Sequence, residues 1–402
     1  MKTIDFKWPL NIKSGSTHAG FKPDEQLDMC WVVSDTPAAA AGVYTTNQFK
    51  AAPVQVTKKT IELNHQLQAI IVNSGNANSF TGDEGIQNVY NSKQLVADKL
   101  HLDDTLIGVA STGIIGKQLD MNTYQNGVDH LELSTDDIDA PEAIITTDTC
   151  SKKVCVELTL NDKPVTITGF SKGSGMIHPN MGTTLSFIVT DANIAGDNLQ
   201  KLLSEDIVST FNQITVDGCM STNDMVLAMA NGAAQNDQLV SGSDEYIEFA
   251  KGFKYVLTTL AKKVAQDGEG ANNFVEVNVN NAFDKQEANL VSKAIVGSNL
   301  VKSMIFGKEA NWGRIVQAIG QTHAHVDPNH VAITLNGTEI VTNSVPVSFT
   351  DEELKALFTD ENIIIDVDLN VGNASGTAWG CDLTYKYVEI NAAYEGWLIW
   401  LF

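Results

Sequence analysis

The chain has 402 residues, of which 43% are apolar and 19% charged, an ordinary globular composition that excludes a disordered, collagen-like or coiled-coil protein. Its 49 acidic and 26 basic side chains give a formal net charge of −23, which disfavours nucleic acid as a partner because a phosphate backbone would be repelled. The first residues hold no apolar core of a signal peptide and no apolar run could span a bilayer, so we expect a cytoplasmic protein without membrane contact.

The five cysteines are an odd number, with no C-x-x-C pair and no histidine cluster beside them. Their spacing fits neither a disulfide framework nor a structural zinc site. Reduced thiols fit best, and we expect no metal and no cofactor. The cysteines are Cys30, Cys150, Cys155, Cys219 and Cys381.

In the first half of the chain, short apolar runs followed by turn residues predict buried strands at residues 68–73 and 105–110. Between them, apolar residues at helical spacing predict an amphipathic helix at residues 84–100. Alternating apolar residues on both sides of Asn161-Asp162-Lys163 predict a hairpin, and residues 185–189 read as another apolar strand.

In the second half, apolar spacing predicts a long helix at residues 250–264, and Asn336-Gly337 predicts a tight hairpin turn within residues 331–341. Thr350 and Glu353 form a capping box for a short helix. Residues 363–369 and 382–390 read as closing strands. Hairpins are too frequent for a purely parallel sheet, so the predicted class is mixed α/β. No composition shift marks a domain boundary.

Several of these strands are followed by loops rich in glycine, hydroxyl and amide side chains. Glycine lets backbone N–H groups approach a ligand, and small polar side chains then orient it. Each loop taken singly could be an ordinary turn or helix cap, but their number favours a ligand site. The loops are residues 73–78, 111–113, 146–149, 172–176, 217–224, 267–270 and 311–314.

The segment at residues 172–185, KGSGMIHPNMGTTL, contains a candidate nucleophile, Thr183. Thr183 could simply be a β-branched residue entering a strand. Alternatively, its hydroxyl could attack the preceding carbonyl, because Gly182 is small enough for a strained turn and the other loops could supply oxyanion donors. The residues alone leave both readings open. The chain contains neither a Walker sequence nor a nucleophile elbow.

Eight segments stand out as a set: VNSGNAN, STGIIGK, TTDT, KGSGMIHPNMGTTL, TVDGCMSTND, DGEGA, FGKEANWGRI and AWGCDLTYKYVEINA. Together they resemble the ornithine acetyltransferase (glutamate N-acetyltransferase) family, and they occur in the family's order over about residues 42–394. The resemblance implies a self-processing, N-terminal-nucleophile-like α/β fold with sheet layers flanked by helices, of the αββα sandwich type. It also implies self-cleavage between Gly182 and Thr183 into an α chain of residues 1–182 and a β chain of residues 183–402, assembled as α2β2.

The same resemblance implies an activity in arginine biosynthesis. After cleavage, Thr183 would have a free α-amine, with a reference pKa of about 7.7–8.0, that can activate its own hydroxyl. That hydroxyl would take acetyl from N2-acetylornithine and pass it to L-glutamate in ping-pong fashion. We expect Lys172 to face the substrate α-carboxylate and Glu269 the ornithine amine. The implied oxyanion hole is Thr112 and Gly113, and the implied substrate contacts are Thr146, Lys172, Thr183, Glu269 and Asn391.

The chain departs from the family pattern at Gly182 and Thr184, where alanine and methionine are usual, and at Gly396, where a hydroxyl residue is usual. Three alternative functions remain open. One is a bifunctional form that also makes N-acetylglutamate from acetyl-CoA. Another is a self-processing aminopeptidase or amidase, and the third is an unprocessed binding protein for small amino acids.

Overall fold

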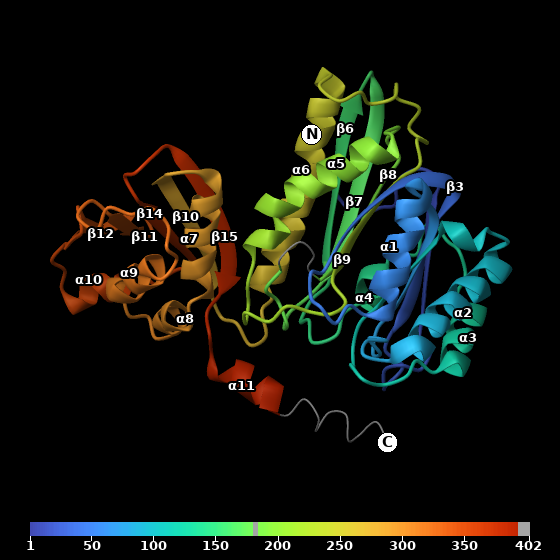
Figure 1. Ribbon diagram of the computed structural model, residues 1–402, viewed down its shortest axis with the longest axis horizontal. Helices are drawn as coiled ribbons and strands as arrows, with labels where there is room; N and C mark the ends of the chain where they lie inside the picture. Colours follow the sequence, from blue (N-terminus) through green and yellow to red (C-terminus); the bar gives the residue numbers. More distant parts are fainter. Residues whose placement is uncertain (180–183, 393–402) are drawn as a thin grey trace. The chain divides into compact units, whose positions relative to one another are not determined.

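The computed structural model describes residues 1–179 and 184–392, and the chain divides into two compact units (Figure 1). The first unit comprises Met1–Gly173, Pro179–Asn212 and Met220–Ala261. The second comprises Ser174–His178, Gln213–Cys219 and Lys262–Phe402. The chain passes between the units more than once, which explains why no single composition shift marks a boundary.

The first unit is built on a nine-stranded sheet in the order β1-β6-β7-β8-β9-β3-β4-β5, with β2 paired to β3. Strands β4 and β5 are parallel, as are β8 and β9, and the other pairs are antiparallel. The strands are β1 (Lys2–Ile4), β2 (Ile12–Thr17), β3 (Met29–Tyr44), β4 (Gln66–Asn73), β5 (Ile107–Ser111), β6 (Lys152–Leu160), β7 (Lys163–Lys172), β8 (Leu185–Thr190) and β9 (Met225–Ala230).

The long strand β3 joins two halves of this sheet. Its first part pairs with β4 and its last part with β9, with a register shift between Val33 and Ala38. Buried apolar side chains of both halves, such as Ile70 of β4 and Phe187 of β8, belong to one hydrophobic core. Burial of this shared core is the main force that holds the two halves together.

Helices cover the other faces of the two halves. Side chains of α2 (Gly82–Leu100) and α3 (Met121–His130) form a separate core with Ile71 and Val109 of β4 and β5. Helix α6 (Asp244–Gln266) packs on β7, where Gly169 leaves room for Val256. The predicted class, mixed α/β with sheet layers flanked by helices, is therefore confirmed. The remaining helices of this unit are α1 (Ala52–Asn64), α4 (Ala140–Ala143) and α5 (Gly196–Asp206).

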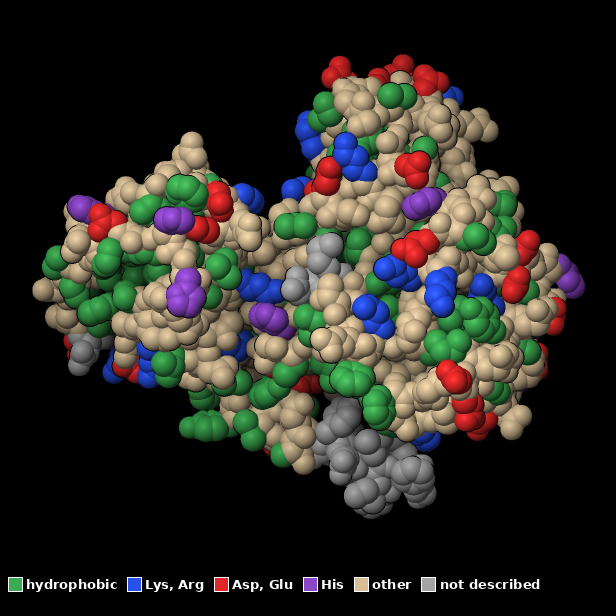
Figure 2. Space-filling model, viewed as in Figure 1, with side chains coloured by type: hydrophobic (Ala, Val, Ile, Leu, Met, Phe, Trp, Pro, Cys, Tyr) green, Lys and Arg blue, Asp and Glu red, His purple; other side chains and the backbone are tan. Residues whose placement is uncertain are grey.

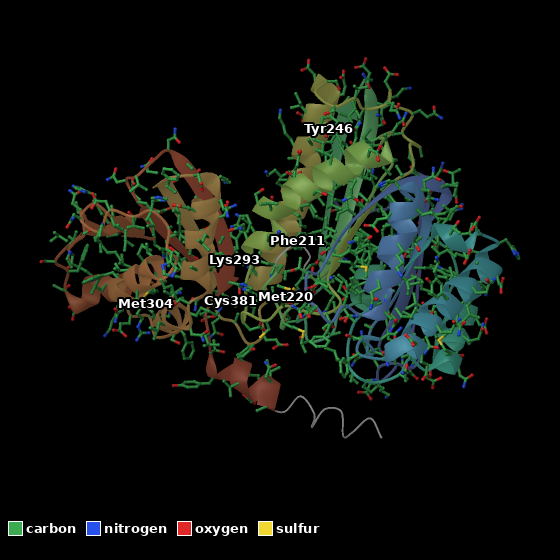
Figure 3. The ribbon with its side chains drawn as sticks, in the orientation of Figure 1. Phe211, Met220, Tyr246, Lys293, Met304 and Cys381 are labelled. Carbon is green, nitrogen blue, oxygen red and sulfur yellow. The ribbon has the colours of Figure 1, made fainter. Side chains whose placement is uncertain are left out.

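The second unit has a six-stranded sheet in the order β13-β12-β11-β14-β10-β15. Helices α7 (Lys285–Gly297), α8 (Asn299–Phe306) and α9 (Trp312–Gly320) bury their apolar faces in one core with the sheet, and Figure 3 labels Met304 of α8. The strands are β10 (Phe274–Ala282), β11 (Ala332–Leu335), β12 (Thr338–Thr342), β13 (Val345–Pro346), β14 (Asn362–Asp368) and β15 (Ala374–Cys381).

Most predicted elements are present. The hairpins at Asn161-Asp162 and Asn336-Gly337 form β6–β7 and β11–β12, with positive φ at all four turn residues. The Thr350–Glu353 capping box opens α10 (Asp351–Ala356). The strand predicted at residues 105–110 begins instead at Ile107, because Asp103 caps a short 3-10 turn at Asp104–Leu106.

The strand predicted at residues 382–390 is wrong. The closing strand is β15, and the chain after it forms helix α11 (Tyr385–Ala392). The Asp382 carboxylate accepts the backbone N–H groups of Asn272 and Asn273, which takes the chain out of the sheet, and Thr384 Oγ1 accepts the N–H of Lys386 at the start of the helix. Together, these two long-range bonds and the local cap at Thr384 outweigh the alternating pattern of the sequence.

At the surface, basic side chains gather over α1, which carries Lys58 and Lys59, despite the acidic balance of the whole chain (Figure 2). All five cysteines are free thiols, and Cys30, Cys155 and Cys381 are buried. Among the described residues, no helix is both long and apolar enough to cross a membrane.

Candidate active site

Several of the polar loops begin or end at strand ends in the two halves of the sheet of the first unit. Strands β4 and β5 are parallel neighbours, so their ends, Asn73 and Ser111, lie at the same edge, where the Ser111 hydroxyl donates to Asn73 Oδ1 at 2.6 Å. At the other half of the sheet, Lys172 ends β7 opposite Leu185, the first residue of β8. Leu185 is in turn level with Met225, the first residue of β9.

The loop after β5 holds the two residues predicted to form the oxyanion hole. The Thr112 N–H donates to the Asn73 carbonyl at 3.0 Å and is therefore already used. Among the described residues, the Thr112 hydroxyl and the Gly113 N–H have no hydrogen-bond partner. Gly113 has φ +131°, and a Cβ on it would lie 2.3 Å from the carbonyl carbon of Gly75. Glycine is therefore required here, and the two unused donors suit an oxyanion.

Residues of a second loop, at 217–224, form hydrogen bonds to the loops at residues 73–79 and 111–113. The Asn223 side-chain amide donates to the carbonyl of Ser111 at 2.8 Å and to that of Ala77 at 2.6 Å. The Ser79 hydroxyl donates to Thr222 Oγ1 at 2.8 Å. The loops at residues 73–79 and 111–113 are therefore fixed to the residues that enter β9.

Asp224, the last residue of that loop, holds the residue that follows the predicted nucleophile. Its carboxylate accepts the Thr184 N–H at 2.7 Å, and the Thr184 hydroxyl lies within hydrogen-bond distance of Ser171 and Ser186. Burial raises the pKa of Asp224 to about 7, although the Thr184 N–H and the charge of Lys172 oppose this rise. The sequence indicated the loop but not this role, because the partners are 40 residues apart.

Asp148 organises the loop that contains Thr146. It forms a fully buried ion pair with Lys152 at 2.6 Å and accepts the N–H groups of Thr146 at 3.0 Å and of Gly173 at 2.6 Å. Burial alone would raise the pKa of Asp148, but the positive charges of Lys172 and Lys152 outweigh it and hold the pKa at about 2. This permanently charged carboxylate therefore fixes two loops relative to each other.

The charge of Lys172 acts on both Asp148 and Asp224, but its amine forms no hydrogen bond with a described residue. The side chain is buried, with 9% of its surface exposed, and no described residue forms a hydrogen bond or ion pair with its Nζ. Its Nζ is not fully enclosed, and it interacts with the charge of Asp148, so the amine is open to a ligand rather than isolated. Lys172 is therefore suited to bind an anion.

In the second unit, the structure brings together two predicted residues that are 122 positions apart. Asn391 of α11 donates its side-chain amide to Glu269 Oε2 at 2.7 Å. The Glu269 N–H donates to the Ser174 carbonyl at 3.1 Å. A Cβ on Gly175 would lie 2.2 Å from Glu269 Oε1, so only glycine allows this carboxylate its position.

The predicted residues are thus found in two groups. Thr112, Gly113, Thr146 and Lys172 belong to the first unit, whereas Glu269 and Asn391 belong to the second. The predicted cleavage residues, Gly182 and Thr183, lie outside the described residues, as do Gly396 and the final apolar segment.

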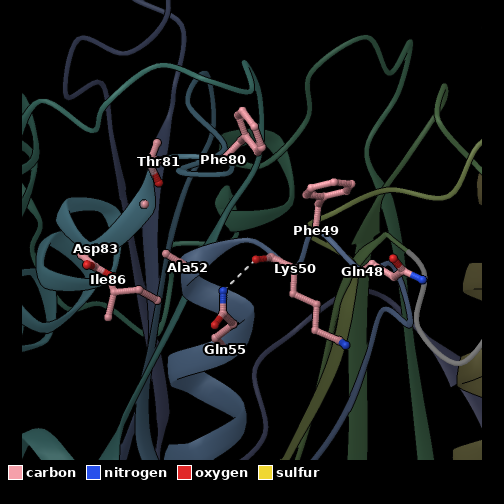
Figure 4. Close-up of a pocket in the computed structure, with 10 residues that line it drawn as sticks. Gln48, Phe49, Lys50, Ala52, Gln55, Phe80, Thr81, Asp83 and Ile86 are labelled. Atoms are coloured by element: carbon pink, nitrogen blue, oxygen red, sulfur yellow. Dashed lines mark hydrogen bonds between the residues drawn. The ribbon is translucent and has the colours of Figure 1, made fainter.

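The first unit also has a surface pocket of about 320 Å³ near the start of α1 and α2 (Figure 4). Phe49 and Phe80 form an edge-to-face pair at 5.8 Å on its lining, and Lys50 and Asp83 bring opposite charges. None of the described residues of the candidate active site lines this pocket.

Comparison with known proteins decides the family. The ArgJ family model matches residues 13–396. The chain belongs to the ArgJ family. The arginine biosynthesis bifunctional protein ArgJ of Streptococcus thermophilus is 48% identical over 397 residues, 98% of this chain and 100% of that one. The protein of the same name from Lactiplantibacillus plantarum is 49% identical over 394 residues, 98% of each chain.

A solved structure agrees with this assignment. The crystal structure of an ArgJ protein from Bacillus halodurans is 47% identical, with a TM-score of 0.52, and covers 53% of this chain and 100% of that chain. The resemblance found in the eight segments is therefore confirmed. ArgJ membership also confirms the predicted function class, an acetyltransferase of arginine biosynthesis.

Proposed function

We propose that this ArgJ protein transfers acetyl from N2-acetylornithine to L-glutamate, through an acetyl ester on Thr183 formed after self-cleavage between Gly182 and Thr183. The observation that carries the proposal is the fixed surroundings of Thr184. Asp224 holds its N–H, and the unused donors of Thr112 and Gly113 belong to the loop that Asn223 ties to the same segment.

The chemistry follows from this arrangement. The Thr183 hydroxyl attacks the Gly182 carbonyl carbon, and the Gly182 acyl group moves from the Thr183 nitrogen to the Thr183 hydroxyl oxygen. Water then hydrolyses the resulting ester. The freed α-amine, with a reference pKa of about 7.7–8.0, then accepts the proton of its own hydroxyl. Each acyl transfer passes through a tetrahedral oxyanion, which the Thr112 hydroxyl and Gly113 N–H stabilise; one such donor is worth about 10²–10³ in rate.

The substrate contacts follow the charges of the side chains. Lys172 binds the α-carboxylate that both amino acids share, since its amine lacks a partner among the described residues. Glu269 binds the amine of the ornithine side chain, and Asn391 orients its carboxylate. Thr146 contributes a hydroxyl on the loop held by Asp148.

Self-cleavage would produce an α chain of residues 1–182 and a β chain of residues 183–402, which we propose assemble as a cytoplasmic α2β2 enzyme. The β chain would have 220 of 402 residues, or about 55%. The chain solved for the Bacillus halodurans protein is fully matched by 53% of this chain. A relative made of two separate chains would produce such a match, so this value supports the proposal.

A second function is favoured by the names of the relatives. The Streptococcus and Lactiplantibacillus proteins are both called bifunctional. A bifunctional enzyme would also accept acetyl from acetyl-CoA and so make N-acetylglutamate without acetylornithine. Supplying acetyl-CoA and glutamate alone to the purified protein separates the two forms, because only the bifunctional form makes acetylglutamate.

The proposed reaction is tested by mass spectrometry of protein mixed with N2-acetylornithine and no acceptor. We expect one acetyl group on the fragment that begins at Thr183, release of one ornithine per site, and loss of the acetyl group when glutamate is added. Release of acetate without any need for glutamate would indicate an amidase instead. Absence of both acetylation and turnover would indicate a binding protein.

A further inference from the structure

The loop at residues 19–22 is built around a buried carboxylate. Asp28, whose side chain is fully buried, accepts four successive backbone N–H groups at 2.6–3.0 Å. Four donors on one carboxylate fix the path of the loop and hence the position of its last side chain. The donors belong to Ala19, Gly20, Phe21 and Lys22.

This loop packs against Gly75, which in turn packs against Gly113 of the candidate oxyanion loop. A Cβ on Gly75 would lie 2.7 Å from the carbonyl oxygen of Phe21, and a Cβ on Gly113 would lie 2.3 Å from the carbonyl carbon of Gly75. The Phe21 backbone, next to Lys22, therefore contacts Gly75 on one side, and Gly113 contacts Gly75 on the other. Lys22 thus follows directly on a residue that contacts the loop at residues 73–78, although no sequence motif indicated it.

The Lys22 amine shares an acceptor with the loop at residues 73–78, because the Ser74 hydroxyl also donates to the Ala143 carbonyl, at 2.6 Å. It donates to the Leu27 carbonyl at 2.9 Å and to the Ala143 carbonyl at 3.5 Å, three residues before Thr146. Burial lowers the pKa of Lys22 to about 8, and the positive charge of Lys172 contributes to this, against the raising effects of Asp28 and Asp148. An ammonium has three donors, and two carbonyls leave one for a ligand.

The nearby carboxylates already accept hydrogen bonds. Asp224, which interacts with the charge of Lys172, accepts the Thr184 N–H. Asp148 is paired with Lys152 and accepts two backbone N–H groups, and Asp28 accepts four. Lys172 has no hydrogen-bond partner among the described residues. Two cations thus face one region of the first unit with donors to spare, in a protein whose net charge is −23.

We propose that Lys22 and Lys172 form a two-cation subsite in which Lys172 binds the α-carboxylate and Lys22 the side-chain carboxylate of a dicarboxylate acceptor. This inference rests on the proposed function and extends it to acceptor choice. Glutamate brings two carboxylates to the subsite, whereas glutamine brings one carboxylate and a neutral amide of the same shape. The charge of Lys22 is therefore a specificity determinant for the acceptor.

Three variants separate charge from structure. Lys22→Gln keeps N–H donors for the Leu27 and Ala143 carbonyls but removes the charge, and Lys22→Arg keeps the charge. Lys58→Met removes an exposed lysine on α1 that pairs with Glu62, and serves as the matched control. The measured quantity is kcat/KM for glutamate divided by kcat/KM for glutamine, with N2-acetylornithine as donor. Thermal unfolding and gel analysis check the folding of each variant.

A charged hydrogen bond of ordinary strength corresponds to about ten- to hundredfold in selectivity. We expect Lys22→Gln to lower the ratio by that factor, mainly through a higher KM for glutamate, while Lys22→Arg and Lys58→Met stay within about threefold of the wild type. The subsite is overturned if Lys22→Gln has the same glutamate-to-glutamine ratio as the wild type. It is also overturned if Lys22→Arg lowers this ratio as much as Lys22→Gln does. If the wild-type protein itself transfers no acetyl group, the proposed function fails, and direct binding of glutamate and glutamine to the same variants then tests the subsite.

Discussion

The buried Asp148–Lys152 pair offers a direct test of how the site is held together. In Asp148→Asn, Lys152 would keep its charge in a fully buried position without its carboxylate. Removing one member of a buried pair typically costs about 3–5 kcal/mol. The pKa of Asp148 gives a smaller figure of the same order, because its fall from 3.8 to about 2 corresponds to about 2.5 kcal/mol at 1.36 kcal/mol per pH unit.

The sign of this effect can be checked with pH. A carboxylate whose folded pKa is depressed stabilises the protein above its unfolded pKa, and this stabilisation is lost as pH falls from about 4 through 2. Denaturant unfolding at pH 7 should therefore show Asp148→Asn to be less stable by about 3–5 kcal/mol, with the difference shrinking below pH 4. The double variant Asp148→Asn with Lys152→Met removes both charges of the pair and should regain part of the loss, since Lys172 still lacks the Asp148 charge. A single variant within about 1 kcal/mol of wild type at pH 7 would refute the reasoning.

Three further predictions concern individual site residues. Gly113→Ala should lower the rate of acetyl transfer about a hundredfold or more, because the added Cβ displaces an oxyanion donor; an unchanged rate removes Gly113 from the oxyanion hole. Burial raises the pKa of Asp224 to about 7, so its stabilising effect is present below about pH 4 and is lost as pH rises through 7. Asp224→Asn keeps an acceptor for the Thr184 N–H but cannot ionise, so its free energy of unfolding should lack this fall with rising pH. Equal slopes of unfolding free energy against pH for the variant and the wild type would contradict the prediction. Asn391→Leu frees the Glu269 carboxylate and should raise KM for N2-acetylornithine more than it lowers kcat in steady-state assays.

Local chemistry explains why much of the fold could be predicted from the sequence. The turn at Asn336-Gly337 and the cap at Thr350 depend on residues within a few positions of one another, and both are present in the structure. The end of the last strand depends instead on Asp382 bonding to Asn272, 110 residues away. No local pattern contains that information, and the strand predicted after it was wrong.

The candidate active site shows the same division. Glycine-rich loops and family motifs indicated Thr112, Gly113, Thr146, Lys172, Glu269 and Asn391, and the structure places the first four in one unit and the last two in contact in the other. The supporting residues were not predictable, because Asp28 and Asp224 act on backbone N–H groups, which every residue type provides. Only the folded chain shows which N–H groups they bind.

The central claim, that Thr183 becomes the first residue of a separate chain, is tested most directly by intact mass measurement and N-terminal sequencing of freshly purified, active protein. We expect two fragments, one ending at Gly182 and one beginning at Thr183, and a single uncut chain for Thr183→Ala. Active wild-type protein with the bond between Gly182 and Thr183 intact would contradict the account.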